Sequence, residues 1–263
     1  MRGSESRHGS GAGGVGAIVE GLVDLVLPAE CVVCGEPATR LCPACRRDLE
    51  AALARPRRVE EGALALPLGP GGAPLPVMAA GVYEPPLSTA LLAFKDHHAL
   101  HLRAPLGEAL ALAAAALRCD PGVPDAAAAL LLPVPGSAAG FRRRGYDPVA
   151  ELARGLPPEW VRSDLVMAPR GALTALPSWA GGAPQHAGSG ATQRRRRSRR
   201  WRPMPGRVPA GTPVLLVDDV VTTGATLRAL AAAAWEAGAR PVGAVVVAGV
   251  EPGRRGTTTR PGP

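Results

Sequence analysis

Two adjacent carboxylates, Asp218 and Asp219, come directly after four apolar residues in the segment VLLVDDVVTTGAT (214–226). The apolar run is typical of a buried strand, and a small loop follows it and opens a helix. The loop consists of Thr222, Thr223, Gly224, Ala225 and Thr226. In such a loop the backbone N–H groups, the hydroxyls and the helix N-terminus can face one anion. Because the carboxylates can hydrogen-bond sugar hydroxyls, the segment predicts a site for a phosphorylated sugar.

The alternative interpretation of this segment is an edge turn with two capping aspartates. Two consecutive aspartates after a buried strand are costly unless they have partners. Ligands of open α/β sheets bind at the carboxyl ends of the strands, which is where these two residues fall. The position therefore favours the binding site over the turn.

Four cysteines lie between residues 31 and 45 in the pattern C-x₂-C-x₇-C-x₂-C: Cys31, Cys34, Cys42 and Cys45. Each C-x₂-C pair places two thiolates on one side of a tight turn, and two such turns complete a tetrahedron around Zn²⁺. Clustered cysteines in a reducing cytosol are metal ligands rather than disulfides. Four thiolates leave no open position, so the pattern predicts a structural zinc site; unligated core cysteines are the alternative.

Three consecutive arginines, Arg142, Arg143 and Arg144, follow an apolar run that ends in Pro-Val-Pro. A guanidinium group binds phosphate oxygens in bidentate fashion, so these side chains are candidates for a second anionic group on the ligand. A solvated basic turn is the alternative. Lys95 could reach the same site, and a position on the open surface is the competing interpretation for it.

The run RRRRSRR (194–200), followed by Trp201 and Arg202, is a candidate contact for single-stranded nucleic acid. Arginines can follow a phosphate backbone, and an aromatic ring among them can stack on a base. A run of like charges is also typical of a solvated or disordered stretch, and that alternative stays open. The net charge of +8 favours anionic partners without distinguishing phosphates from nucleic acid.

The elements that must position these residues alternate between strands and helices. Apolar runs typical of strands occupy 77–83, 126–132, 214–217 and 241–248. Helical periodicity is found at 15–27, from the last cysteine of the cluster to about 54, and at 87–94, 102–117, 147–156 and 226–237. A strand, loop, helix and strand over 214–248 form a βαβ unit. This predicts an α/β fold with a parallel sheet flanked by helices.

Length and composition set the domain organisation. The 263 residues suffice for one α/β core and a small additional module, and 46% of them are hydrophobic. We expect five parts: a disordered leader (1–14), a helix plus zinc module (15–54), a linker or irregular connection (55–76), the main domain (77–250) and a disordered tail (251–263). Residues 169–211 lack periodicity and predict a long, mobile excursion.

The apolar stretch 15–27 is the one N-terminal candidate for a signal or a membrane segment. It carries Glu20 and Asp24 and is shorter than the roughly 20 apolar residues that a membrane span needs. We therefore expect no membrane span and a cytoplasmic location.

The segment 214–226 resembles the signature of type I phosphoribosyltransferases, which bind 5-phosphoribosyl 1-diphosphate (PRPP). The resemblance implies that the ribose 2′- and 3′-hydroxyls contact the two aspartates, which are also the catalytic candidates, and that the loop wraps the 5′-phosphate. The implied PRPP-binding residues are Asp218, Asp219, Val220, Val221, Thr222, Thr223, Gly224, Ala225 and Thr226.

The order of segments also resembles the ComF/GntX family over roughly residues 20 to 250. A four-cysteine module comes first, followed by YEPPLSTALLAFK (83–95), LLPVPGSAAGFRRRGYDPVAELARGL (131–156) and the PRPP signature. The resemblance implies a type I phosphoribosyltransferase-like domain behind a small zinc module. It further implies transfer of ribose 5-phosphate from PRPP, bound with Mg²⁺, to an acceptor that the sequence does not name. Arg142, Arg143 and Arg144 would lie on the pyrophosphate side.

A second hypothesis is a protein that binds PRPP or a nucleotide without turning it over. ComF-like proteins are linked as a family to natural competence, so the resemblance implies DNA-uptake or helicase partners. Two departures from the family pattern favour this hypothesis. Asp147 and Pro148 stand where the family has Asn-Gln, and QHAGSGATQRRRR (185–197) only loosely matches a later family motif. The intact segment 214–226 favours the enzyme.

Overall fold

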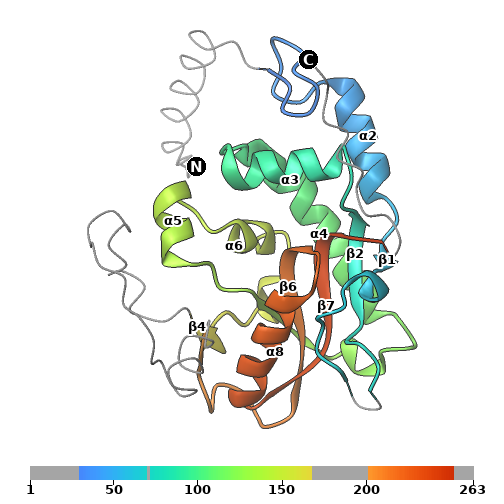
Figure 1. Cartoon of the computed structure of the whole chain (residues 1–263). Coiled ribbons are helices and arrows are strands. Elements are labelled where there is room, and N and C mark those ends of the chain that lie inside the picture. Colours follow the sequence, from blue (N-terminus) through green and yellow to red (C-terminus); the bar gives the residue numbers. More distant parts are fainter. Residues whose placement is uncertain (1–29, 70–71, 168–200, 252–263) are drawn as a thin grey trace, which may run out of the picture.

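The structure is a computed structural model that describes residues 30–69, 72–167 and 201–251 (Figure 1). Its centre is a five-stranded sheet with the strand order β1-β2-β7-β6-β3. These strands are β1 (Arg57–Arg58), β2 (Val77–Val82), β3 (Leu130–Pro133), β6 (Thr212–Val221) and β7 (Ala239–Gly249). All neighbouring strands are parallel except β1 and β2. The predicted α/β fold with a mainly parallel sheet is confirmed.

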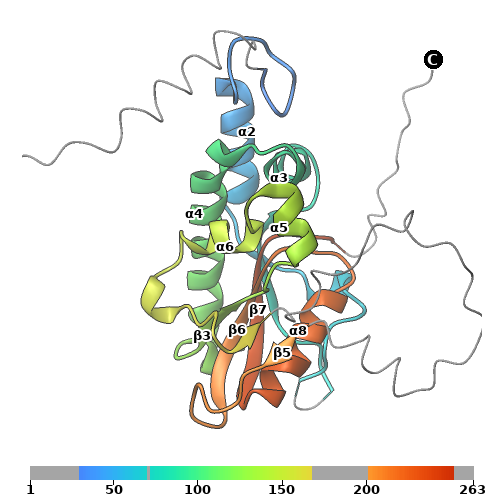
Figure 2. The same ribbon diagram turned by 90° about the vertical axis from the view of Figure 1, so that its left-hand side faces the viewer.

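Helices cover both faces of the sheet (Figures 1 and 2). The helices are α2 (Pro43–Leu53), α3 (Leu87–Asp96), α4 (Arg103–Arg118), α5 (Ala138–Arg144), α6 (Pro148–Ala153) and α8 (Ala225–Glu236). Short 3₁₀ turns are η1 (Glu60–Gly62), η2 (Leu100–Leu102), η3 (Pro124–Ala126) and η4 (Pro158–Trp160). Helix α4 packs on β2 and β7 with α6 beside it, and α8 packs on β6 and β7. The two layers enclose two hydrophobic clusters, one on each side of the sheet.

Strand β6, which carries the two aspartates, is buried on both faces of the sheet. Its side chains alternate between the two faces, as in any strand. Leu215 and Val217 belong to the cluster under α3, α4 and α6, whereas Val214 and Leu216 belong to the cluster under α8. Both faces are apolar because a parallel sheet is covered on both sides. The next two side chains are the aspartates, and both line one pocket at the carboxyl end of the strand.

One helical segment among the described residues, Leu100–Arg118, is long and apolar enough to cross a membrane by length and composition. It contains α4, whose Leu106, Leu110 and Leu117 are fully buried against the sheet. The core helix of an α/β layer has the same length and composition, so this segment is weak evidence for a membrane span.

The segment 55–76, interpreted above as a linker or irregular connection, contributes to the sheet and to the core. Strand β1 pairs with β2, and Val59, Leu66 and Leu75 are buried. The backbone N–H of Ala65 donates to the carbonyl of Thr223 at 2.7 Å, which ties this segment to the predicted phosphate loop. Two exposed arginines form β1, so the sequence has no apolar alternation there to indicate a strand.

Two further predictions fall on residues that the structure describes in part. Of the predicted excursion 169–211, residues 201–211 are described, and they include β5 (Arg202–Pro203). This strand pairs antiparallel with β4 (Val166–Met167). The predicted leader, the helix at 15–27, the arginine run 194–200 and the tail beyond residue 251 lie outside the described residues.

Candidate functional site

A pocket of about 370 Å³ lies beside the two adjacent carboxylates, at the carboxyl ends of β3 and β6. Its walls come from α3, the connection between β3 and α5, the start of α6, residue 201, and the start of α8. The charged side chains that line it are Lys95, Arg144, Asp147, Asp218 and Asp219. This is the edge at which open α/β sheets bind ligands.

The carboxylate pair is buried, with Asp218 7% and Asp219 6% exposed. The Lys95 Nζ atom lies 2.9 Å from Asp219 Oδ2, and the Asp219 N–H donates to Asp218 Oδ1 at 2.9 Å. Burial, followed by the charge of Asp219, raises the pKa of Asp218 well above its usual range. The Asp219 N–H and the Lys95 ammonium oppose that rise. Ionisation of Asp218 is therefore disfavoured, while the Lys95 ammonium lies against the Asp219 carboxylate.

Lys95 stands in the last turn of α3, half-buried at the pocket wall. Burial disfavours its ammonium, but the adjacent Asp219 carboxylate outweighs that effect and raises the pKa of Lys95 above its usual value. The structure therefore places Lys95 at the site as a cation. Of the two interpretations drawn from the sequence, the position on the open surface is wrong.

The predicted phosphate loop runs from the end of β6 to the first turn of α8. Gly224 has a φ of 83°, a left-handed conformation that favours glycine, and α8 begins at the next residue. Thr222, Thr223 and Ala225 are exposed beside the pocket, whereas Thr226 lines it. The Ala225 N–H donates to the Thr223 hydroxyl at 3.3 Å. The loop thus presents hydroxyls and the amino end of α8 at the rim of the pocket.

The three consecutive arginines divide between two environments. Arg144 lines the pocket, and its Nε atom is buried without a hydrogen-bond partner among the described residues. Arg142 and Arg143 are exposed. The Asp96 Oδ1 atom lies 3.3 Å from Arg143 Nη2 and 3.8 Å from Arg144 Nη1. Helix α5 separates them, because side chains one and two residues apart on a helix point in different directions. Among the three, Arg144 alone lines this pocket.

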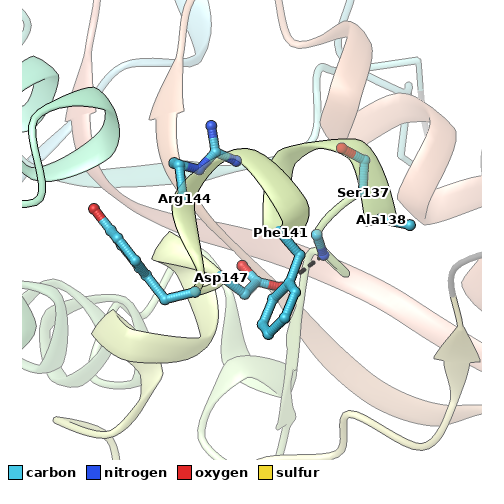
Figure 3. A pocket seen from close by; sticks show the side chains of 7 residues that line it. Ser137, Ala138, Phe141, Arg144 and Asp147 are labelled. Atoms are coloured by element: carbon cyan, nitrogen blue, oxygen red, sulfur yellow. Dashed lines mark hydrogen bonds between the residues drawn. The ribbon is translucent and has the colours of Figure 1, made fainter.

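A second, smaller pocket of about 190 Å³ adjoins the first (Figure 3). Ser137 and Ala138 line it at the start of α5. Arg144, the last residue of α5, and Asp147 line it near the other end of that helix. These four residues also line the larger pocket, so the two hollows share a wall. Phe141 contributes an exposed ring to the smaller one.

Asp147, one of the departures from the family pattern, has a structural role. Its Oδ1 atom accepts the N–H groups of Val149 and Ala150 and so caps α6, while Oδ2 accepts the Gly136 N–H at 2.8 Å. A Cβ atom on Gly136 would lie 2.3 Å from that oxygen. The carboxylate thus fixes the connection between β3 and α5 to the start of α6.

Trp201 contradicts part of the nucleic-acid prediction. Its side chain is 5% exposed and lines the pocket, and its indole N–H donates to the Pro135 carbonyl at 3.0 Å. A ring in this position packs between the layers and cannot stack on a base from solvent. The prediction of base stacking is therefore wrong for Trp201, and the preceding arginine run lies outside the described residues.

The four clustered cysteines gather as the sequence predicts, with their Sγ atoms all within 4.8 Å of one another. The Cys34 and Cys42 sulfurs are 3.8 Å apart. Four sulfurs at about 2.3 Å from one Zn²⁺ ion in a tetrahedron are about 3.8 Å apart, so the cluster fits the ion. Burial opposes ionisation of Cys31, but backbone N–H groups led by that of Cys42 lower its pKa to about 6. Cys119 is exposed and lies outside the cluster.

Comparison of the sequence with protein-family models and with curated proteins finds no match.

The sequence did not predict three contacts of the site: the pairing of Lys95 with Asp219, the contact of Leu66 with Gly224, and the packing of Trp201. Each joins segments far apart in the chain, and local periodicity carries no signal of such contacts.

Proposed function

We propose that this chain binds PRPP together with Mg²⁺ in the larger pocket and transfers the ribose 5-phosphate group to an acceptor. The observation that carries the proposal is the buried pair Asp218 and Asp219 at the carboxyl end of a central strand. The left-handed Gly224 and the first turn of α8 follow it directly. This order of groups supplies hydroxyl acceptors and a phosphate cradle in one place.

Each group has a role in this reaction. The Asp219 carboxylate would accept a hydrogen bond from one ribose hydroxyl, and protonated Asp218 can both donate to and accept from the other. The loop that contains Thr223 would hold the 5′-phosphate. The acceptor's lone pair attacks C1 of the ribose, and the bond from C1 to pyrophosphate breaks with its electron pair leaving on pyrophosphate. Holding the ribose in one orientation favours this displacement.

The leaving pyrophosphate accumulates negative charge, which Arg144 would stabilise from the pocket wall. Mg²⁺ bound with PRPP would supply further positive charge to the leaving pyrophosphate. We assign the pyrophosphate side to Arg144 and not to the exposed Arg142 and Arg143. The cytoplasmic location remains a prediction.

Calorimetric titration of the zinc-loaded protein with PRPP and Mg²⁺ tests the proposal. We expect micromolar binding by the wild type and none by the Asp218→Asn/Asp219→Asn double variant. Arg144→Gln is expected to weaken binding by at least about tenfold, since it removes a charge-assisted contact. Arg142→Gln is the matched control and should bind as the wild type does. A folded wild type that does not bind PRPP would overturn the proposal.

The second candidate is a PRPP- or nucleotide-binding adaptor without turnover, and one observation favours it. Among the described residues that line the larger pocket, no carboxylate is free to act as a base toward an acceptor. Asp147 is held by three backbone N–H groups, Asp219 by Lys95, and Asp218 favours its proton. Release of pyrophosphate from PRPP in the presence of candidate acceptors supports the enzyme. Binding without release supports an adaptor, for which DNA-uptake or helicase partners remain predictions.

A further inference from the structure

Lys95 is distinctive in the composition of the chain. The sequence contains 30 basic residues counted as Lys and Arg, and Lys95 is its only lysine, so the remaining 29 are arginines. An ammonium is a compact point charge, whereas a guanidinium is a wide planar fork. The single compact cation of the chain lies at the buried carboxylate pair.

The neighbourhood of Lys95 is almost neutral. Its charged or titratable neighbours are Asp218 and Asp219 on β6, Arg144 at the end of α5, Asp147 before α6, and Tyr83 after β2. Of these, Asp219 lies in direct contact, with the Lys95 Nζ atom 2.9 Å from its carboxylate. The Lys95 ammonium therefore offsets negative charge at the carboxylate pair.

Two adjacent carboxylates without a cation would attract a divalent metal. Mg²⁺ and Mn²⁺ prefer oxygen ligands, and one or two carboxylates are a common way of holding them. In this site the Lys95 ammonium lies 2.9 Å from one Asp219 oxygen, so a metal ion on that carboxylate would lie close to the ammonium. Repulsion between two cations a few ångströms apart in a partly buried site is large.

We propose that Lys95 is a resident cation that keeps divalent metals off Asp218 and Asp219 and thereby reserves both carboxyl groups for sugar hydroxyls. Lys95 is then a specificity-determining residue that acts by exclusion. Mg²⁺ reaches the pocket with the pyrophosphate of the ligand rather than ahead of it. The exclusion of metal is independent of the proposed function, whereas its meaning for ribose recognition rests on that function.

Binding of Mn²⁺ alone, followed by the electron paramagnetic resonance signal of the free ion, tests the exclusion without PRPP. The zinc-loaded protein is used, because the thiolate cluster retains Zn²⁺ in preference to Mn²⁺. We expect no site at the carboxylate pair in the wild type and in Lys95→Arg, which keeps the charge. Lys95→Met should bind Mn²⁺ at least about tenfold more tightly than the wild type. The Lys95→Met/Asp218→Asn/Asp219→Asn variant should lose that gain.

A chemical version of the experiment covers the case in which Lys95→Met does not fold. Acetylation of the folded wild type removes the charge of the only lysine side chain; the α-amine also reacts, and acetylated Lys95→Arg controls for it. The acetylated wild type should gain the same Mn²⁺ site. Equal Mn²⁺ binding before and after removal of the charge would overturn the inference, as would a gain that persists without the two aspartates.

Calorimetry with PRPP on the same proteins separates this inference from the proposed function. A Mn²⁺ site gained in Lys95→Met upholds the inference even if the wild type fails to bind PRPP, in which case the proposed function alone is overturned. Conversely, a wild type that binds PRPP and a Lys95→Met variant that gains no Mn²⁺ site would overturn the inference and leave the function standing.

Discussion

At the scale of single residues, Asp218 illustrates a conflict between binding and stability. Its burial raises its pKa, so in the folded protein it holds a proton to a higher pH than it does in the unfolded chain. At a pH between the pKa of Asp218 in the unfolded chain and its pKa in the folded protein, the folded state binds more protons than the unfolded state. The free energy of unfolding therefore falls as the pH rises through this range. Under the proposed function, a carboxyl group that binds a sugar hydroxyl here would lower the stability of the protein as the pH rises.

This fall of the free energy of unfolding with rising pH gives a prediction for Asp218→Asn, whose side chain cannot ionise. The variant should gain stability relative to the wild type as the pH rises, and the difference should shrink as the pH falls. Denaturant unfolding at several pH values measures it. Asp125→Asn is the control, since Asp125 is exposed and pairs with Arg240 at the surface. A difference that stays constant with pH for Asp218→Asn would contradict the prediction.

At the scale of elements, the predicted phosphate loop (222–226) is held in place by the segment before β2. The Ala65 N–H donates to the Thr223 carbonyl, and Leu66 lies against Gly224. A Cβ atom on Gly224 would meet the Leu66 side chain at 2.7 Å and its backbone nitrogen at 3.0 Å. The segment 55–76 therefore fixes the loop conformation, although it is distant from the loop in sequence.

Gly224→Ala should destabilise the protein by about 2–3 kcal/mol and weaken PRPP binding. Part of the cost is the left-handed conformation, about 1 kcal/mol, and the rest is the clash with Leu66. Gly238→Ala is the matched control, because Gly238 has a φ of 92° and nothing within 4 Å of an added Cβ. Chemical unfolding and calorimetry compare the two variants. Equal losses of stability in both would show that Leu66 does not constrain the loop.

The elements that the sequence predicted well are those with a continuous local pattern. The apolar runs that became β6 and β7 and the alanine-rich helix α8 needed no long-range information, because burial on both faces gives an unbroken apolar run. Strands β1 and β5 have two residues each, so no periodicity could indicate them. The adjacent aspartates were found from their place after a buried strand. Their partner Lys95 and the choice of Arg144 depend on tertiary packing, which sequence spacing does not encode.

At the scale of the whole molecule, the cysteine cluster and the sheet share one core. Cys31, Cys42 and Cys45 belong to the same buried cluster as the apolar side chains of α3 and α4, and α2 contacts both β2 and α3. A metal held by these cysteines therefore stabilises more than the turn that carries them. We expect the zinc module and the sheet to unfold together.

Cys34→Ser tests this coupling, and Cys119→Ser is its matched control because both side chains are exposed. Cys34→Ser should lower the zinc content and reduce the melting temperature of the whole protein by more than about 5 °C. Cys119→Ser should change neither. Metal analysis and thermal unfolding followed by circular dichroism measure the two effects. A separate low-temperature transition, with the main transition unchanged, would instead show that the module unfolds on its own.

Coupled unfolding has a consequence for the pocket, because the helix against which α2 packs is the one that carries Lys95. Loss of zinc that loosens α2 also loosens the position of the Lys95 ammonium over Asp219. We therefore expect Cys34→Ser, at a temperature where it is still folded, to weaken PRPP binding although its substitution lies in the zinc module. Unchanged PRPP affinity in a zinc-depleted, folded Cys34→Ser protein would show that α3 holds Lys95 in place without the metal.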